Sequence, residues 1–225
     1  MVRNRIYSVL TGDIVGSSRI SSEKRAFFLS KLKDLFSSMK TVFPQTEISA
    51  PFGIYRGDSF QGILGTPEHA LKVAIFLRAN LRSGLHVDLE LYGLDARIAQ
   101  GIGTIDSLPE DRVSEGDGEA FRLSGPALDK MKDEQFFLIR TPWEGINGEL
   151  DVECALLDFL IQKWTPRQAE SILCSIRGLT QEQAAAELKI SQPAVRYRLQ
   201  GAGGRVVDLI TRRFEQLIKS KIGNQ

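Results

Sequence analysis

Residues 165–200 read TPRQAESILCSIRGLTQEQAAAELKISQPAVRYRLQ, and this stretch holds three successive signals for the start of a helix. Each signal is a Thr or Ser that can cap a helix, followed within the first turn by proline or three residues later by glutamine. The pairs are Thr165 with Gln168, Thr180 with Gln183, and Ser191 with Pro193. The stretch therefore predicts three short helices joined by tight turns.

Small side chains lie where the second predicted helix meets the third. Ala184 and Ala185 are short, and Leu188 follows one turn later. Gly178 is placed to end the first helix, and Ile190 to fill the turn before the third. Close approach of two helices across such a turn is typical of a helix-turn-helix, in which the last helix enters the major groove of DNA.

Helical periodicity divides the third helix into two faces. Val195 and Leu199 are expected to face the core, and the opposite face is expected to read bases. The residues of that second face are Gln192, Arg196, Tyr197 and Gln200. Arginine can bind guanine and glutamine can bind adenine, each contributing about 1–3 kcal/mol of discrimination.

Further arginines are candidates for phosphate contacts, which position a protein on DNA without reading sequence. They are Arg198, Arg205, Arg212 and Arg213. From Thr165 onward the chain has ten Lys/Arg against five Asp/Glu, whereas the preceding residues have nineteen against twenty-three. This asymmetry favours a basic module that meets a polyanion. The alternative is a helical bundle that packs against a protein partner.

The stretch from Thr165 to Leu199 resembles the LuxR-type and sigma-factor region 4 class of helix-turn-helix domains. The caps, the small residues and the turn positions agree with that class together. The resemblance implies double-stranded DNA as the partner and transcription regulation as the function.

The residues before this module alternate between strand and helix patterns. We expect strands at 6–10, 47–50, 54–64, 87–92, 96–105 and 136–139, and helices at 22–42, 70–81 and 118–131. The first hairpin is expected to turn at 51–53, and the Gly- and Pro-containing segment 141–148 to form a linker. This order predicts an α+β fold of the ferredoxin-like kind, an antiparallel sheet with helices on one face. The predicted domains are 1–141, a connector at 142–164, and 165–225.

Two carboxylates in the first predicted domain are candidate metal ligands. Asp13 belongs to GDIVGSS (12–18), which follows the first strand, and Asp58 belongs to the hairpin segment RGDSF (56–60). In a ferredoxin-like sheet these two segments can be neighbours. A pair of carboxylates on adjacent strands is what Mg²⁺ ions need for in-line phosphoryl transfer.

These motifs resemble the class III nucleotidyl cyclase domain, with GDIVGSS and GDSFQGIL as its two metal motifs. The resemblance implies Mg²⁺ or Mn²⁺ with a nucleotide, held by Asp13, Asp58 and the carbonyl of Ile14. The chain departs from the family where a purine-selecting lysine is expected, since that position is Ile54. Arg122 replaces an asparagine, and Pro126 replaces a catalytic arginine. Proline has no charge to stabilise a pentavalent phosphate, so we do not expect cyclisation as that family performs it.

Three interpretations of the first domain follow. It is a degenerate cyclase fold that binds a nucleotide or metal and controls the DNA module, a purely structural domain in which both aspartates form turns, or an enzyme of altered chemistry. A homodimer is expected, because both resembled folds commonly dimerise. The chain lacks a signal-peptide pattern and a membrane-spanning apolar run, so a cytoplasmic location is expected. Its two cysteines and two histidines show no zinc spacing.

Overall fold

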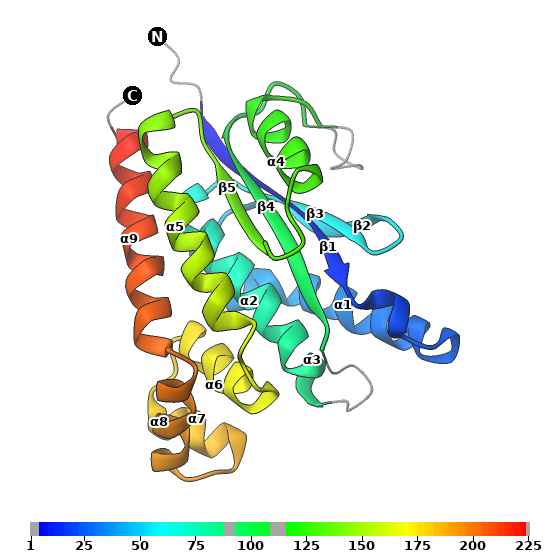
Figure 1. Ribbon diagram of the computed structural model, residues 1–225, viewed down its shortest axis with the longest axis vertical. Coiled ribbons are helices and arrows are strands. Elements are labelled where there is room, and N and C mark those ends of the chain that lie inside the picture. Colours follow the sequence, from blue (N-terminus) through cyan, green and yellow to red (C-terminus); the bar gives the residue numbers. More distant parts are fainter. Residues whose placement is uncertain (1–4, 88–92, 109–115, 224–225) are drawn as a thin grey trace.

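The computed structural model describes residues 5–87, 93–108 and 116–223, and it has an α+β fold. Within these residues, five strands form one sheet (Figure 1): β1 (Ile6–Val15), β2 (Ile48–Arg56), β3 (Ser59–Leu64), β4 (Asp95–Thr104) and β5 (Phe137–Arg140). The spatial order is β2-β3-β1-β4-β5. The central strand β1 is antiparallel to both neighbours, β3 and β4.

The edge strand β5 corrects the prediction of a wholly antiparallel sheet. It pairs with β4 in parallel, from Ile98 opposite Phe137 to Gly101 opposite Arg140. The reason is the helix α4 (Glu119–Asp129), which lies between the two strands in sequence. A helical crossover returns the chain to the same end of the sheet, so that the next strand runs parallel.

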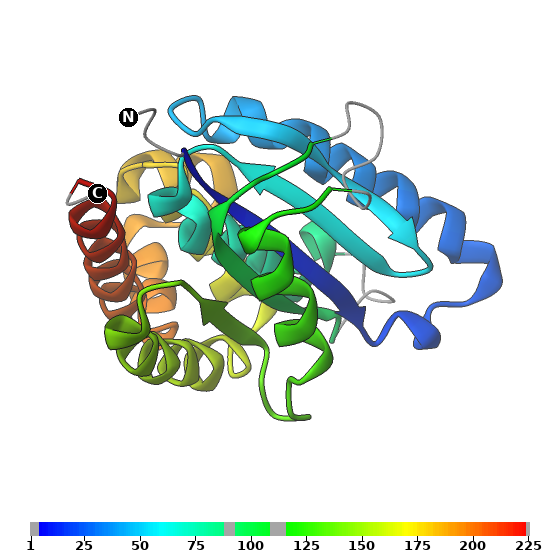
Figure 2. The same ribbon diagram turned by 90° about the horizontal axis from the view of Figure 1, so that it is seen from above.

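The two faces of the sheet are covered by different helices, and the prediction of helices on one face is therefore wrong. Leu10 packs into the core beneath α1 (Ser22–Val42) and α2 (Ala70–Arg82), whereas its neighbour Val9 packs with Ala120 of α4. Figure 2 shows α4 and α1 on opposite sides of the sheet. The close approach of α4 needs glycine at Gly101, because a Cβ there would lie 2.0 Å from the carbonyl oxygen of Ala120.

Several local predictions also differ from the structure. The first strand continues to Val15, so that GDIV is part of β1 rather than a loop after it. The hairpin turns at Gly57 and Asp58 instead of 51–53. β2 accommodates Pro51 through shifts of its register with β3. The predicted strand 87–92 starts in the last residue of the short helix α3 (Gly84–Val87), and its remaining residues lie outside the described ones.

The C-terminal third is helical: α5 (Glu144–Ile161), α6 (Pro166–Ile176), α7 (Gln181–Leu188), α8 (Gln192–Gly201) and α9 (Gly204–Gly223). Helix α5 contradicts the predicted linker at 141–148, because it begins at Glu144. Ile146 and Leu150 are buried in the core, and their burial outweighs the helix cost of Gly145 and Gly148, about 1 kcal/mol each.

A buried arginine joins the sheet to α5. Arg78 of α2 is fully buried and donates to Asp95 at 2.8 and 3.0 Å and to Asp158 of α5 at 2.6 Å. Nearby, Arg82 donates to the carbonyl oxygen of Trp164 at 2.9 Å. One hydrophobic cluster also runs from the sheet through α2, α5, α6 and α9. The α+β part and the C-terminal helices therefore share a core.

Candidate nucleic-acid interface

The three helices predicted from residues 165–200 are present as α6, α7 and α8, and each begins at its predicted cap. Thr165 and Thr180 both form reciprocal capping boxes, with Gln168 and Gln183. The hydroxyl of Ser191 accepts from the backbone N–H of Ala194 at 3.4 Å. These caps satisfy backbone donors that would otherwise lack partners at each helix start.

A small apolar cluster holds the three helices together. Its buried members are Cys174 of α6, Ala184 and Ala185 of α7, and Val195 of α8. Ile190 and Leu199 pack against this cluster. This agrees with the prediction that Ile190 fills the turn and with the helical periodicity that places Val195 and Leu199 toward the core. The chain reverses between α7 and α8 at Lys189, whose backbone is left-handed with φ 54°. The cluster therefore fixes α8 with its opposite side facing solvent.

The outward side of α8 presents the central residues of the predicted base-reading face. Tyr197 is 78% exposed, and Arg196 and Gln200 are exposed beside it. Among the described residues, Arg196 and Tyr197 form no hydrogen bond or ion pair that fixes their side chains within the protein. Gln192 is only half-buried, and its amide donates to Gln181 of α7 at 2.5 Å. The exposed side of α8 therefore centres on Arg196, Tyr197 and Gln200.

The arginines predicted to bind phosphates fall into two groups. Arg205 is exposed and lines a shallow surface hollow together with Arg196 and Gln200. The other three already have acidic partners: Arg198 lies 3.8 Å from Glu170, Arg213 lies 2.7 Å from Glu149, and Arg212 pairs with Asp208. Arg205 is therefore the member of this set whose charge is most available to a partner.

The other predicted site lies at the end of β1, where the sheet brings Asp13 and Asp58 into one neighbourhood. Asp13 is opposite Ser59 in the register of β1 with β3, and the N–H of Ile14 donates to the backbone carbonyl of Asp58 at 3.2 Å. The side chain of Ile14 is buried in the core. Strand pairing thus accounts for the proximity of these two segments.

Both carboxylates at the end of β1 already have protein partners. Arg97 of β4 donates to both oxygens of Asp13, at 3.0 and 2.6 Å, and these hydrogen bonds raise the pKa of its guanidinium. The hydroxyl of Ser17 donates to Asp58 at 2.5 Å. Within the described residues, no group of three or more His, Cys, Asp or Glu is arranged to hold a metal ion. A cation at Asp13 would have to displace Arg97.

Sequence reasoning missed Arg97. It lies 84 positions from Asp13, and it faces Asp13 directly only because β4 pairs with β1. It belongs to ARIAQGIG (96–103), which resembles a core strand of the nucleotidyl cyclase domain, but the register of that predicted strand with the first strand could not be predicted.

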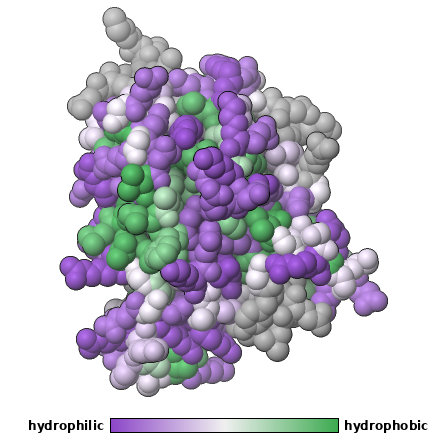
Figure 3. Space-filling view, viewed as in Figure 1, coloured by the Kyte–Doolittle hydropathy of each residue, from purple (hydrophilic) through white to green (hydrophobic). Residues whose placement is uncertain are grey.

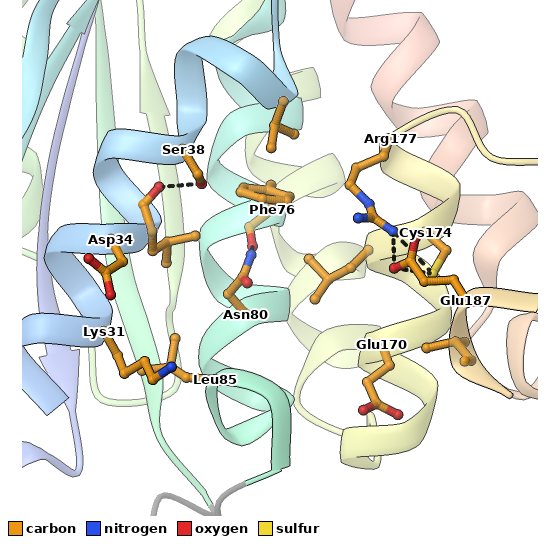
Figure 4. A pocket seen from close by; sticks show the side chains of 14 residues that line it. Lys31, Asp34, Ser38, Phe76, Asn80, Leu85, Glu170, Cys174, Arg177 and Glu187 are labelled. Carbon is orange, nitrogen blue, oxygen red and sulfur yellow. Dashed lines mark hydrogen bonds and ion pairs between the residues drawn. The ribbon is translucent and has the colours of Figure 1, made fainter. Parts of the chain in front are cut away.

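A cavity of about 340 Å³ lies between the α+β part and the first two helices of the C-terminal module. Its walls come from α1, α2, α6 and α7, and Figure 4 shows the side chains of ten labelled residues around it. On one wall, Arg177 pairs with Glu187 and contacts the sulfur of Cys174 at 3.6 Å. Burial raises the pKa of the Cys174 thiol, which keeps it protonated at neutral pH. The volume is at the lower end of that of small-molecule sites.

No protein-family model matches this chain, and no curated protein matches it. Within the described residues, no helix combines the length and the apolar character that crossing a membrane requires. The geometry of the site is therefore the basis for any functional assignment.

Proposed function

We propose that this protein is a DNA-binding transcriptional regulator of the cytoplasm, in which α6, α7 and α8 act as a helix-turn-helix. The observation that carries this proposal is the outer side of α8, where Arg196, Tyr197 and Gln200 are exposed on a helix whose inner side is fixed by Val195. A rigid helix with an exposed arginine and glutamine matches the chemistry of base edges in the major groove.

In this proposal the residues of the module have distinct roles. Arg196 and Gln200 read bases, Tyr197 contacts a base or sugar beside them, and Arg205 binds a phosphate. Gln192, held by Gln181, and Arg198, close to Glu170, lie at the edges of the same surface and make supporting contacts.

The α+β part has a sensing or dimerisation role in this proposal. The strand order β2-β3-β1-β4 and its antiparallel pairing support a ferredoxin-like assignment, as the resemblance to the nucleotidyl cyclase domain implies. The shared core and the cavity between α2 and α6 support a regulatory connection. A ligand that changes the packing of the α+β part would also change the packing of the C-terminal helices.

The test is selection of sites from fragmented genomic DNA by the full chain, compared with Arg196→Ala. We expect a discrete set of enriched sites and a loss of about 10- to 100-fold in specific affinity for the variant. Arg25→Ala is the matched control, because Arg25 is an exposed arginine on α1. If the unmodified protein enriches no site even at low salt, where phosphate contacts are strongest, the proposal fails.

A second candidate is a metal-dependent nucleotidyl enzyme with an accessory helix-turn-helix, and the proximity of Asp13 and Asp58 favours it. Mg²⁺ or Mn²⁺ with a nucleotide would bind there once Arg97 had moved away from Asp13. Asp13→Asn with Asp58→Asn separates the two candidates. The double variant should abolish Mn²⁺-dependent nucleotide turnover if the enzyme is correct, and should leave affinity for an isolated DNA site unchanged if α8 is the DNA-binding element.

A further inference from the structure

An exposed apolar face extends over α5 and α9. Val152, Leu156 and Phe159 of α5 lie at helical spacing, and Val206 and Leu209 occupy the first two turns of α9. These five side chains are between 42% and 61% exposed. Figure 3 shows hydrophobic residues gathered on this side of the molecule. We call these five residues the apolar face.

The two helices of the apolar face lie side by side and run in opposite directions. Near the start of α5, Glu149 pairs with Arg213 of α9. Near its end, Leu160 lies close to Gly203, because a Cβ added at Gly203 would lie 3.0 Å from the Leu160 side chain. These positions place the end of α5, which carries Leu156 and Phe159, beside the start of α9, which carries Val206 and Leu209. The apolar face is therefore continuous across both helices.

Most charged groups that can be named at the edge of the apolar face have internal partners, whereas Arg205, beside Val206, is exposed and pairs with no described residue. Glu149 pairs with Arg213, Asp151 with Arg140, and Asp208 with Arg212. The ammonium group of Lys163 lies 3.3 Å from the centre of the Phe159 ring. Apart from Arg205, the acidic and basic groups at this edge are paired with one another within the chain. Such an edge suits a partner that is equally apolar at its centre and equally balanced in charge around it.

The size of the apolar face matches the need of a dimer. From their exposed fractions, the five side chains present roughly 400–500 Å² of apolar surface, which is in the range of functional patches. A stable interface buries about 800 Å² per partner, of which about 56–65% is apolar. One copy of the apolar face thus supplies the apolar part of such an interface.

The direction of the two helices also suits a two-fold dimer. Figure 1 shows α5 and α9 running along the molecule with α6, α7 and α8 at one end. A two-fold axis parallel to these helices would place both α8 helices at the same end of the dimer. That arrangement allows two half-sites of one duplex to be contacted together.

We propose that the apolar face packs against the same face of a second copy of this chain, forming a four-helix seam from α5 and α9 of both protomers. The use of the dimer, to present two α8 helices to one duplex, rests on the proposed function. The seam itself does not require DNA.

The test measures the mass of the full chain without DNA by sedimentation velocity, at protein concentrations around 10 µM. We expect a dimer for the unmodified protein. Leu156→Glu should weaken dimerisation about 100-fold or more, because the two-fold axis would bury two unpaired carboxylates. Leu156→Met should keep the dimer, and so should Phe27→Glu, which changes an exposed phenylalanine outside the apolar face. Circular dichroism checks that each variant is folded.

The outcomes separate this inference from the proposed function. A monomer for the unmodified protein, or a dimer that a folded Leu156→Glu leaves intact, overturns the seam. A dimer that Leu156→Glu dissociates supports the seam, even if no DNA site is found. If DNA is bound, dissociation should remove cooperative binding to two half-sites while affinity for a single half-site persists.

Discussion

The outer side of α8 and the end of β1 both carry charged side chains that were predicted from the sequence as site residues. In the structure, the charged side chain on α8 is exposed and unpaired, whereas those at the end of β1 are hydrogen-bonded to other residues. Arg196 of α8 is exposed and makes no ion pair with any described residue. Asp13 of β1 is held by two hydrogen bonds from Arg97, and Asp58 accepts one from Ser17. A partner can therefore bind Arg196 directly, whereas a ligand of Asp13 or Asp58 must displace Arg97 or Ser17.

This difference has an energetic consequence. Removing Arg97 from Asp13 would break a two-point pair and leave a charged group to be solvated again, and a metal ion would have to compensate for this cost. The proposed binding of DNA by Arg196 would require only that its side chain lose water and rotamer freedom. The comparison therefore favours α8 as the binding surface and a structural role for the Asp13–Arg97 pair.

The largest expected effect tests whether the α+β part, which contains β1, and the C-terminal helices, which include α8, unfold together. Arg78→Ala should lower the free energy of unfolding by about 3–5 kcal/mol, because Asp95 and Asp158 would be left buried without their partner. Denaturant unfolding, followed by both circular dichroism and tryptophan fluorescence, should show one shared transition at lower denaturant concentration. Arg140→Ala, which removes a more exposed pair with Asp151, should cost less than about 1 kcal/mol. Separate transitions for the two regions would show that the shared core does not couple them.

A middle-sized effect concerns pH at the contact between α5 and α9. Burial, together with the charge of Glu149, raises the pKa of Glu153 to about 7, and Arg213 partly opposes this. The folded state therefore holds its proton more tightly than the unfolded chain, and stability falls as pH rises from about 5 to 8. Glu153→Gln should remove the loss of stability that comes from ionisation of Glu153. At pH 8 the variant should have a free energy of unfolding about 2 kcal/mol higher than the unmodified protein, which allows for partial contact of Glu153 with solvent.

The measurement is the free energy of unfolding of both proteins at pH 5 and pH 8. At pH 5 the difference between them should be small, because Glu153 is protonated in the folded state. Equal pH dependence in the two proteins would show that the Glu153 carboxyl titrates as an ordinary exposed group.

The smallest effect concerns the local signals that predicted the C-terminal module. Thr180→Ala removes the hydroxyl of the capping box at the start of α7 and should lower the free energy of unfolding by about 1 kcal/mol. Thr41→Ala, at an exposed position on α1, is the control and should change stability by less than about 0.5 kcal/mol. Thermal unfolding of both variants measures the difference. Equal effects would mean that the cap contributes nothing beyond helix propensity.

Local chemistry in the sequence predicted the starts of α6, α7 and α8 and the inward positions of Val195 and Leu199. Caps and helical periodicity act over at most a few residues, so that these features can be recognised in one stretch of chain. The same holds for α1, whose predicted range 22–42 agrees with the structure. The outward positions of Arg196 and Tyr197 follow directly from that periodicity.

Only the tertiary structure decided how distant segments meet. The parallel pairing of β5, the place of α4 on the opposite face of the sheet, and the pairing of Arg97 with Asp13 depend on the register of strands far apart in the chain. The helical start of α5 was decided by the burial of Ile146 and Leu150 against the propensity of two glycines. Register and burial are properties of the whole packed core, and no local stretch of sequence carries that information.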